Sequence, residues 1–304
     1  MSTQQPDTDS TVKQFERLLD RFYPKVEEAL NRFAWPGAEM PPRLREAMDY
    51  SLLAGGKRLR PILVLAACEA VGGDPITALP VAAAFEMVHT YSLIHDDLPA
   101  MDDDDLRRGR PTCHVKFGDA TAILAGDGMM TFAFQSIAEG IDDPGAAIAV
   151  IRELSRAAGV EGMVGGQQAD LESEGDAPDL ERLRYIHRRK TGALIIAAVV
   201  CGAIVGGADK ATIEALKRYG ADIGLAFQVV DDILDLTATA EELGKSPGKD
   251  RAANKMTYPA LMGLEEAKKH AEALVDNAER ELESLGEAAG PLRTIARYIV
   301  ERGN

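Results

Sequence analysis

Apolar residues recur every three or four positions along most of this chain, which is the spacing of one face of an α-helix. The first such stripe lies between residues 15 and 33 and contains Phe15, Leu18, Leu19, Phe22, Val26, Leu30 and Phe33. The same spacing predicts further helices near residues 43–54, 60–71, 77–97, 120–138, 145–170, 180–187, 191–206, 210–236, 257–285 and 291–302. Gly, Pro and Asp gather between several of these stretches, as is typical of turns. The pattern predicts an all-α protein.

One predicted helix is unusually apolar. The eighteen residues from Thr191 to Ala208 carry no formal charge and approach the length of a membrane span. Because the segment is rich in Ala and Gly and has no counterpart in the chain, we expect a buried central helix and no membrane span. The first ten residues lack the basic flank and apolar run of a secretory signal, so we expect a cytoplasmic protein.

The chain is long enough for one large domain or two ordinary ones. Of the 304 residues, 46% are hydrophobic and only 5% aromatic, which suits a sizeable core made of helices. Because no long linker divides the chain, we expect a flexible tail at residues 1–12 and a single domain at residues 13–304. A formal net charge of −15 argues against nucleic-acid binding. Three widely spaced cysteines suit core packing in a reducing compartment: Cys68, Cys113 and Cys201.

Two aspartate-rich runs each follow an apolar stretch, and they carry the first sign of chemistry. Burying so much like charge is prohibitive unless cations neutralise it. Pro99 should turn the first run back at a helix end, whereas Asp231 and Asp235 share one helical face. Oxygen ligands without paired His or Cys favour magnesium over zinc, with manganese as the alternative. The runs are Asp96-Asp97-Leu98-Pro99-Ala100-Met101-Asp102 and Asp231-Asp232-Ile233-Leu234-Asp235.

Basic residues gather at separate points of this acidic chain. Any one cluster, like either aspartate run alone, has a solvent-exposed surface as its simpler explanation. Together they indicate clamps for a multiply charged, phosphate-bearing anion, because Arg offers a planar fork of donors and Lys a point charge. The clusters are Lys57-Arg58-Leu59-Arg60, Arg107-Arg108-Gly109-Arg110, Arg188-Arg189-Lys190, and the group Lys245, Lys249, Arg251 and Lys255.

The order of the motifs resembles that of one enzyme family, the trans-isoprenyl diphosphate synthases of the bacterial farnesyl diphosphate synthase type. The resemblance runs from about Phe15 to the C-terminus in one register. It implies an isoprenoid synthase fold, a single-domain helical bundle around a deep central cavity, and a homodimer. The motifs that carry it are Gly55-Gly56-Lys57-Arg58-Leu59-Arg60-Pro61, residues 89–102, Arg107-Arg108-Gly109, Gly165-Gly166-Gln167, Lys190-Thr191-Gly192 and residues 227–235.

The resemblance also implies a role for each motif. Several magnesium ions would be held by Asp96, Asp97, Asp102, Asp231, Asp232 and Asp235. The isopentenyl diphosphate site would consist of Gly56, Lys57, Arg60, His89 and Arg108. The allylic diphosphate site would consist of Arg107, Lys190, Thr191, Gln228, Lys245 and Lys255. The catalytic residues would be Lys190, Thr191, Gln228, Asp96 and Asp231, with Gln167 and Asp170 supporting them.

The implied reaction joins isopentenyl diphosphate to dimethylallyl and geranyl diphosphates by ionisation, condensation and proton elimination. Tyr91 precedes Asp96 by five residues, so its ring would sit roughly 7.5 Å deeper along the helix, at about 1.5 Å per residue. Tyr91 and Ser92 would then form the floor beneath the growing tail. In the resembling family, an aromatic residue here accompanies a C15 product and a smaller one a C20 product. We therefore predict farnesyl diphosphate, with geranylgeranyl diphosphate synthase as the alternative.

Three other functions explain less of the sequence. A class I terpene cyclase would carry a different second metal motif and would not need a second diphosphate clamp. A non-catalytic subunit with the same fold would be expected to have lost metal or clamp residues, and none is missing. An acidic metal-buffering protein would leave the basic clusters unexplained.

Overall fold

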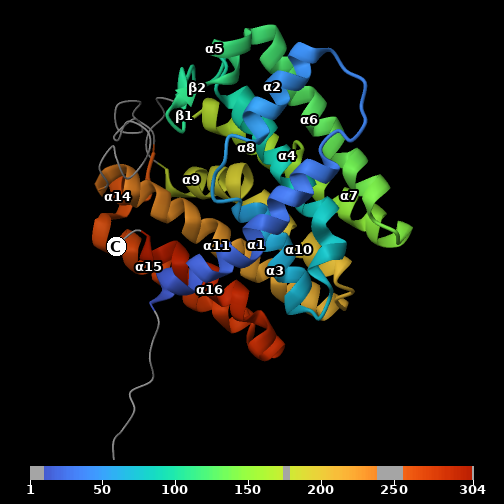
Figure 1. Ribbon diagram of the computed structural model, residues 1–304. Helices are drawn as coiled ribbons and strands as arrows, with labels where there is room; N and C mark the ends of the chain where they lie inside the picture. Colours follow the sequence, from blue (N-terminus) through green and yellow to red (C-terminus); the bar gives the residue numbers. More distant parts are fainter. Residues whose placement is uncertain (1–9, 174–178, 238–255, 303–304) are drawn as a thin grey trace, which may run out of the picture.

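The computed structural model describes residues 10–173, 179–237 and 256–302 and confirms the predicted all-α fold (Figure 1). The first helices are α1 (Thr11–Phe33), α2 (Pro42–Leu52), α3 (Leu59–Ala70), α4 (Leu79–Asp96), α5 (Cys113–Phe117), α6 (Asp119–Gly140) and α7 (Pro144–Ala158). They are followed by α8 (Met163–Leu171), α9 (Leu180–His187), α10 (Ala193–Val205), α11 (Lys210–Thr237), α14 (Tyr258–Met262), α15 (Leu264–Glu281) and α16 (Gly290–Glu301). Short helical turns occur at η1 (Pro75–Ala78), η2 (Arg188–Gly192) and η3 (Glu283–Ala289), and strands β1 (Leu106–Arg107) and β2 (Arg110–Pro111) pair as an antiparallel hairpin.

Two apolar helices form the centre of the bundle. Residues 79–88 of α4 are all buried, and α4 packs against α1, α3 and α6. Helix α10 packs against α3, α7 and α11, so its uniformly apolar surface meets other helices on several sides. The predicted buried helix at residues 191–206 is therefore confirmed. None of the described helices combines the length and apolar character that a membrane crossing needs.

Two of the predicted helices were wrong as single elements. The stretch 145–170 is interrupted between α7 and α8 at residues 159–162, where Gly162 has φ −123° and ψ −123°. The stretch 257–285 is interrupted at Gly263, whose φ of +86° separates α14 from α15. Apolar periodicity continued across both breaks because the flanking helices bury residues in the same core. Helix α5 and the β1–β2 hairpin were missed because they are too short to show a period.

The long C-terminal helices complete one side of the bundle. Helix α11 packs along α10 and α15, and α16 contacts α1 and α11. Figure 1 shows α15 and α16, coloured orange to red, on the lower side, and α5 with the hairpin at the top. All three cysteines are buried and form no disulfide, as core packing requires. The predicted tail lies mostly outside the described residues, whose first helix begins at Thr11.

Candidate functional site

The first aspartate run turns back on itself at the end of α4, as predicted. The backbone N–H of Asp102 donates to the carbonyl of Asp96 at 2.9 Å, and that of Asp103 to Leu98 at 3.2 Å. Burial raises the pKa of Asp96 to about 6, and the neighbouring carboxylates of Asp102 and Asp97 contribute to the same shift. The charge of Lys190 opposes it. The turn therefore gathers negative charge where it is costly.

These carboxylates fit a divalent cation. A cation between Asp96 and Asp102 would remove the cost of ionising the half-buried Asp96, and both residues supply hard oxygen donors. Within the part of the chain that the structure describes, no three Asp, Glu, His or Cys side chains converge as a ligand set. An ion here would take its other ligands from water or from phosphate oxygens, as magnesium commonly does.

Asp97 and Arg107 are bonded to each other. Asp97 is 3% exposed and accepts hydrogen bonds from Nε of Arg107 at 2.8 and 2.9 Å and from Nη2 at 2.5 Å. The hairpin makes this contact possible, because its turn at Arg108 and Gly109 has positive φ at both residues, as in a type I′ turn. Both partners line a small pocket beside the hairpin. Their predicted contacts with metal and diphosphate stay predictions.

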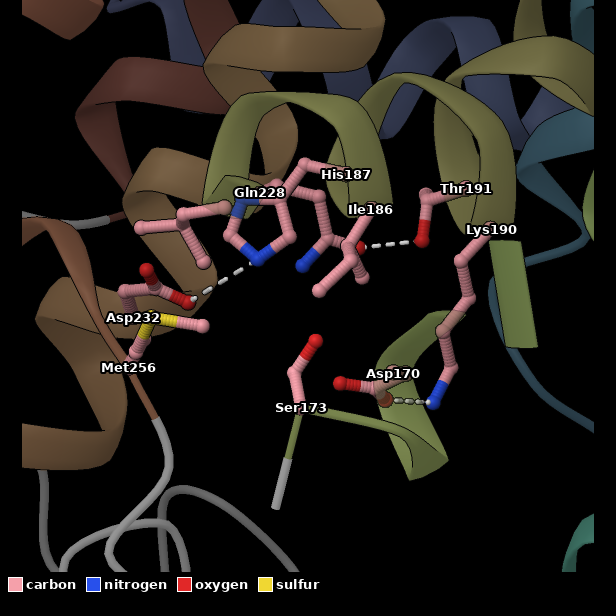
Figure 2. Close-up of a pocket in the computed structure, with 10 residues that line it drawn as sticks. Asp170, Ser173, Ile186, His187, Lys190, Thr191, Gln228, Asp232 and Met256 are labelled. Atoms are coloured by element: carbon pink, nitrogen blue, oxygen red, sulfur yellow. Dashed lines mark hydrogen bonds and ion pairs between the residues drawn. The ribbon is translucent and has the colours of Figure 1, made fainter. Parts of the chain in front are cut away.

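The predicted catalytic groups of η2 meet α8 and α11 in one pocket (Figure 2). Lys190 Nζ lies 2.6 Å from the Asp170 carboxylate, and the Thr191 hydroxyl donates to the amide oxygen of Gln228. Lys190 and Thr191 belong to a π-helical turn, an irregularity that often occurs at functional sites. No feature of the sequence had indicated this turn. Figure 2 shows the side chains of these pairs directed toward the same hollow.

Lys190 is held charged at this position. Burial alone would lower the pKa of Lys190, but the charges of Asp170, Asp96 and Asp102 outweigh it and raise that pKa. Its backbone is fixed by close packing against α8. A Cβ atom on Gly166 would lie 2.2 Å from the backbone nitrogen of Lys190, so only glycine allows the two segments to approach this closely. A half-buried cation thus lies near the first aspartate run.

All five residues predicted for isopentenyl diphosphate line a single cavity of about 470 Å³: Gly56, Lys57, Arg60, His89 and Arg108. The Nε atom of Arg60 is buried and has no hydrogen-bond partner among the described residues. Burial and the charges of Arg60 and Arg108 hold the pKa of His89 well below its usual range, so its ring is neutral. The cavity therefore presents an unused cationic donor beside a neutral imidazole, which suits an anion.

Backbone geometry shapes this cavity. Gly56 has φ +121°, and a Cβ atom on it would lie 2.6 Å from the Arg108 guanidinium. Arg108 in turn donates to the carbonyl of Gly55. Lys57 Nζ lies 3.1 Å from the hydroxyl of Tyr298, whose ring stacks on Phe15 at 3.7 Å. Helices α1 and α16 thus support the basic cluster at the start of α3.

A second cavity of about 360 Å³ adjoins the first. Arg60 and His89 line both, so the two cavities meet at these residues. Tyr91 is 5% exposed, and its ring meets that of His95 edge to face at 5.8 Å. The other lining residues that bear on function are the predicted Ser92, Asp96, Lys190 and Thr191, together with the apolar Met163 and Val164. The cavity is polar near Asp96 and has apolar side chains to receive a hydrocarbon.

The carboxylates of the second aspartate run lie in different surroundings. Asp231 lines the 470 Å³ cavity and accepts a hydrogen bond from Arg302 at 2.8 Å. Asp232 lines the pocket of Figure 2 and accepts from the backbone N–H of Tyr258 at 2.9 Å. Asp235 is 8% exposed on α11. Of the three carboxylates, only Asp231 lines the cavity that contains Arg60 and His89, the residues at which the two cavities meet.

Arg302 is a functional candidate that the sequence did not reveal. Besides its bond to Asp231, its guanidinium lies 3.9 Å from the ring centroid of Phe227. No spacing rule links residues so far apart in the chain, so only folding brings them together. Lys245 and Lys255, predicted for the allylic site, lie outside the described residues.

Comparison with known proteins agrees with this geometry. A family model described as polyprenyl synthetase matches residues 41–290. The chain belongs to the polyprenyl synthetase family. This prenyl synthase is 49% identical to farnesyl diphosphate synthase of Geobacillus stearothermophilus over 291 residues, which cover 94% of this chain and 97% of that protein. It is 52% identical to geranylgeranyl pyrophosphate synthase 11, chloroplastic, of Arabidopsis thaliana, over 95% of this chain and 83% of that protein.

A solved structure supports the same assignment. The chain resembles an FPP/GFPP synthase from Zymomonas mobilis with a TM-score of 0.82 and 43% sequence identity. The likeness covers 93% of this chain and 99% of that one. The predicted isoprenoid synthase fold is confirmed, and the chain is a prenyltransferase by family.

We expect Asp96→Asn to stabilise the metal-free protein while removing activity. A carboxyl whose pKa is raised on folding stabilises the fold below about pH 4, and this contribution is lost as pH rises through about 6. Thermal unfolding with a chelator should show a gain of about 1–3 kcal/mol for the variant at pH 7.5 and a smaller difference at pH 4. The exposed Asp105→Asn is the control and should show neither change. Equal stability of Asp96→Asn and wild type at pH 7.5 would contradict the inferred cost of ionising Asp96 in the folded protein.

Proposed function

We propose that this prenyl synthase condenses isopentenyl diphosphate with dimethylallyl and then geranyl diphosphate to form (2E,6E)-farnesyl diphosphate. The observation that carries the proposal is the meeting of two cavities at Arg60 and His89. One cavity offers basic donors for a diphosphate, and the other leads from Asp96 past Tyr91 between apolar side chains. A terpene cyclase acts on one diphosphate and would have no use for the first cavity.

The allylic substrate would bind with its diphosphate near Asp96 and Lys190 and its hydrocarbon toward Tyr91. Magnesium held by Asp96, Asp102 and Asp231 would supply positive charge to the leaving diphosphate. Lys190, which Asp170 keeps charged and in place, would donate to the same group as its negative charge grows.

Thr191 and Gln228 would act on the cation that ionisation leaves behind. Their side chains are bonded to each other, which fixes the direction of the two oxygen dipoles. Because both dipoles are in place before the reaction, little reorganisation is needed when the positive charge develops. Groups of this kind stabilise an allylic cation without reacting with it.

The second substrate would be oriented by its own clamp. The unpartnered Nε of Arg60 would donate to the diphosphate of isopentenyl diphosphate, with Lys57 and Arg108 adding charge. His89, being neutral, would donate one hydrogen bond without adding charge. Holding the alkene beside the allylic carbon replaces a bimolecular encounter with an oriented one. Loss of a proton to the departed pyrophosphate would then restore a double bond.

Tyr91 supports a C15 product. Its ring lies in the wall of the hydrocarbon cavity five residues before Asp96, and burial raises the pKa of its phenol to about 12, so it stays neutral. Relatives named for farnesyl and for geranylgeranyl diphosphate are similarly close, so the residue lining the cavity is the better guide to length. Geranylgeranyl diphosphate remains the alternative product.

A homodimer is part of the proposal. Helix α6 carries three exposed large apolar residues, Ile123, Leu124 and Met130, at 44%, 57% and 36% exposure. A second copy of the chain packed on α6 would cover this apolar surface.

The reaction is tested by mass spectrometry of the products formed from dimethylallyl and isopentenyl diphosphates with magnesium. We expect a C15 diphosphate that disappears when the metal is chelated. A C20 product would retain the mechanism and overturn the assigned length, and absence of any condensation would overturn the proposed function.

Replacing Tyr91 by alanine should lengthen the product. The change removes the ring from the cavity wall, so we expect C20 and longer products to replace most of the C15 product. Tyr91→Phe is the matched control, because it keeps the ring and loses only a hydroxyl that has no hydrogen-bond partner among the described residues. Continued formation of C15 alone by Tyr91→Ala would show that another side chain limits the tail.

A further inference from the structure

One arginine beside the proposed isopentenyl diphosphate cavity has no part in the chemistry above. Arg58 stands in the chain between Lys57 and Arg60, yet its side chain is only 1% exposed. Each of its three guanidinium nitrogens donates to a protein acceptor. Its charge is therefore used within the protein. The acceptors are the Glu27 carboxylate at 2.9 Å, the Glu86 carboxylate at 2.7 Å and the Leu52 carbonyl at 2.9 Å.

Arg58 also has a strained backbone. It precedes the first residue of α3 with φ 49° and ψ 37°, the left-handed conformation, which is unfavourable for a non-glycine residue. Such a conformation persists only where surrounding contacts enforce it. Here the three side-chain bonds supply that enforcement. The resulting path of the chain lets both Lys57 and Arg60 line the same cavity.

The partners of Arg58 connect it to the opposite wall of the cavity. Glu86 lies on α4 three residues before His89, so the two share one helical face. Glu27 lies on α1, which also packs against α4. Arg58, Glu86 and Glu27 form an ionic cluster that ties the start of α3 to the part of α4 that carries His89.

We propose that this ionic cluster holds the side chains of Lys57, Arg60 and His89 in the relative positions that bind the diphosphate of isopentenyl diphosphate. The inference rests on the proposed function of that cavity. Glu86 itself lines the cavity, where an unpaired carboxylate would repel a diphosphate. Its ion pair with Arg58 neutralises that charge and joins α4 to the start of α3.

The sign of the effect of Glu86→Gln distinguishes positioning from simple electrostatics. Removing a negative charge next to an anion site would, by charge alone, tighten binding. Loss of the contact between Glu86 and Arg58 would instead weaken the binding of isopentenyl diphosphate. For Glu86→Gln we expect the KM for isopentenyl diphosphate to rise about tenfold, while the KM for geranyl diphosphate stays within about twofold. An unchanged or lower KM for isopentenyl diphosphate would overturn the proposal.

Two further variants separate this effect from general destabilisation. Glu27→Gln removes the more exposed partner, at 32% exposure, and should raise the same KM about threefold, which keeps the test available if Glu86→Gln does not fold. Leu274→Ala opens a hole in α15, away from both cavities. It should lower the unfolding temperature and leave both KM values unchanged. A selective rise in the KM for isopentenyl diphosphate with Leu274→Ala would overturn the proposal.

Calorimetry with isopentenyl diphosphate separates failure of this inference from failure of the proposed function. If the wild-type protein does not bind isopentenyl diphosphate, the cavity has been misassigned and the proposed function fails. If wild type binds and Glu86→Gln binds as tightly, only the positioning role fails. We expect about tenfold weaker binding by Glu86→Gln.

Discussion

Ionic pairing inside a helical core is the interaction on which the rest of this structure depends. The pair of Arg58 and Glu86 is fully buried, the pair of Arg107 and Asp97 buries the carboxylate, and the pair of Lys190 and Asp170 is half-buried. Charges in such places are costly unless each is paired with good geometry. These pairs join α3 to α4, the hairpin to α4, and η2 to α8. The same contacts that neutralise the charges therefore fix the walls of the site.

Groups left out of this pairing mark where ligands belong. Nε of Arg60 has no partner among the described residues, and the pKa of Asp96 is raised because burial opposes its charge. Backbone strain is found partly in the same region. Of the four non-glycine residues with positive φ in the described part of the chain, Arg58, Asp103 and Arg108 lie in the segments that border the cavities, and Trp35 lies between α1 and α2. Backbone strain of this kind concentrates at functional sites, where the surrounding contacts can sustain it.

Those features of the candidate site that depend on neighbouring residues could be predicted from the sequence. The fold-back from Asp96 to Asp102 required only a proline after a helix. The five residues that the resemblance assigned to isopentenyl diphosphate all line one cavity. The breaks between α7 and α8 and between α14 and α15 were missed, because periodicity reports which face is buried and not whether the helix is continuous.

The sequence by itself determined the all-α class, the buried helix α10 and the identity of the charged motifs, because each depends on local spacing or residue type. Only the tertiary structure decided which charged residues pair with each other. Asp97 and Arg107 bind each other, Asp231 meets Arg302, and Arg58 is tied to Glu86. These partners are separated in the chain, and their pairing is set by helix packing and the cost of burying charge, which no local pattern records.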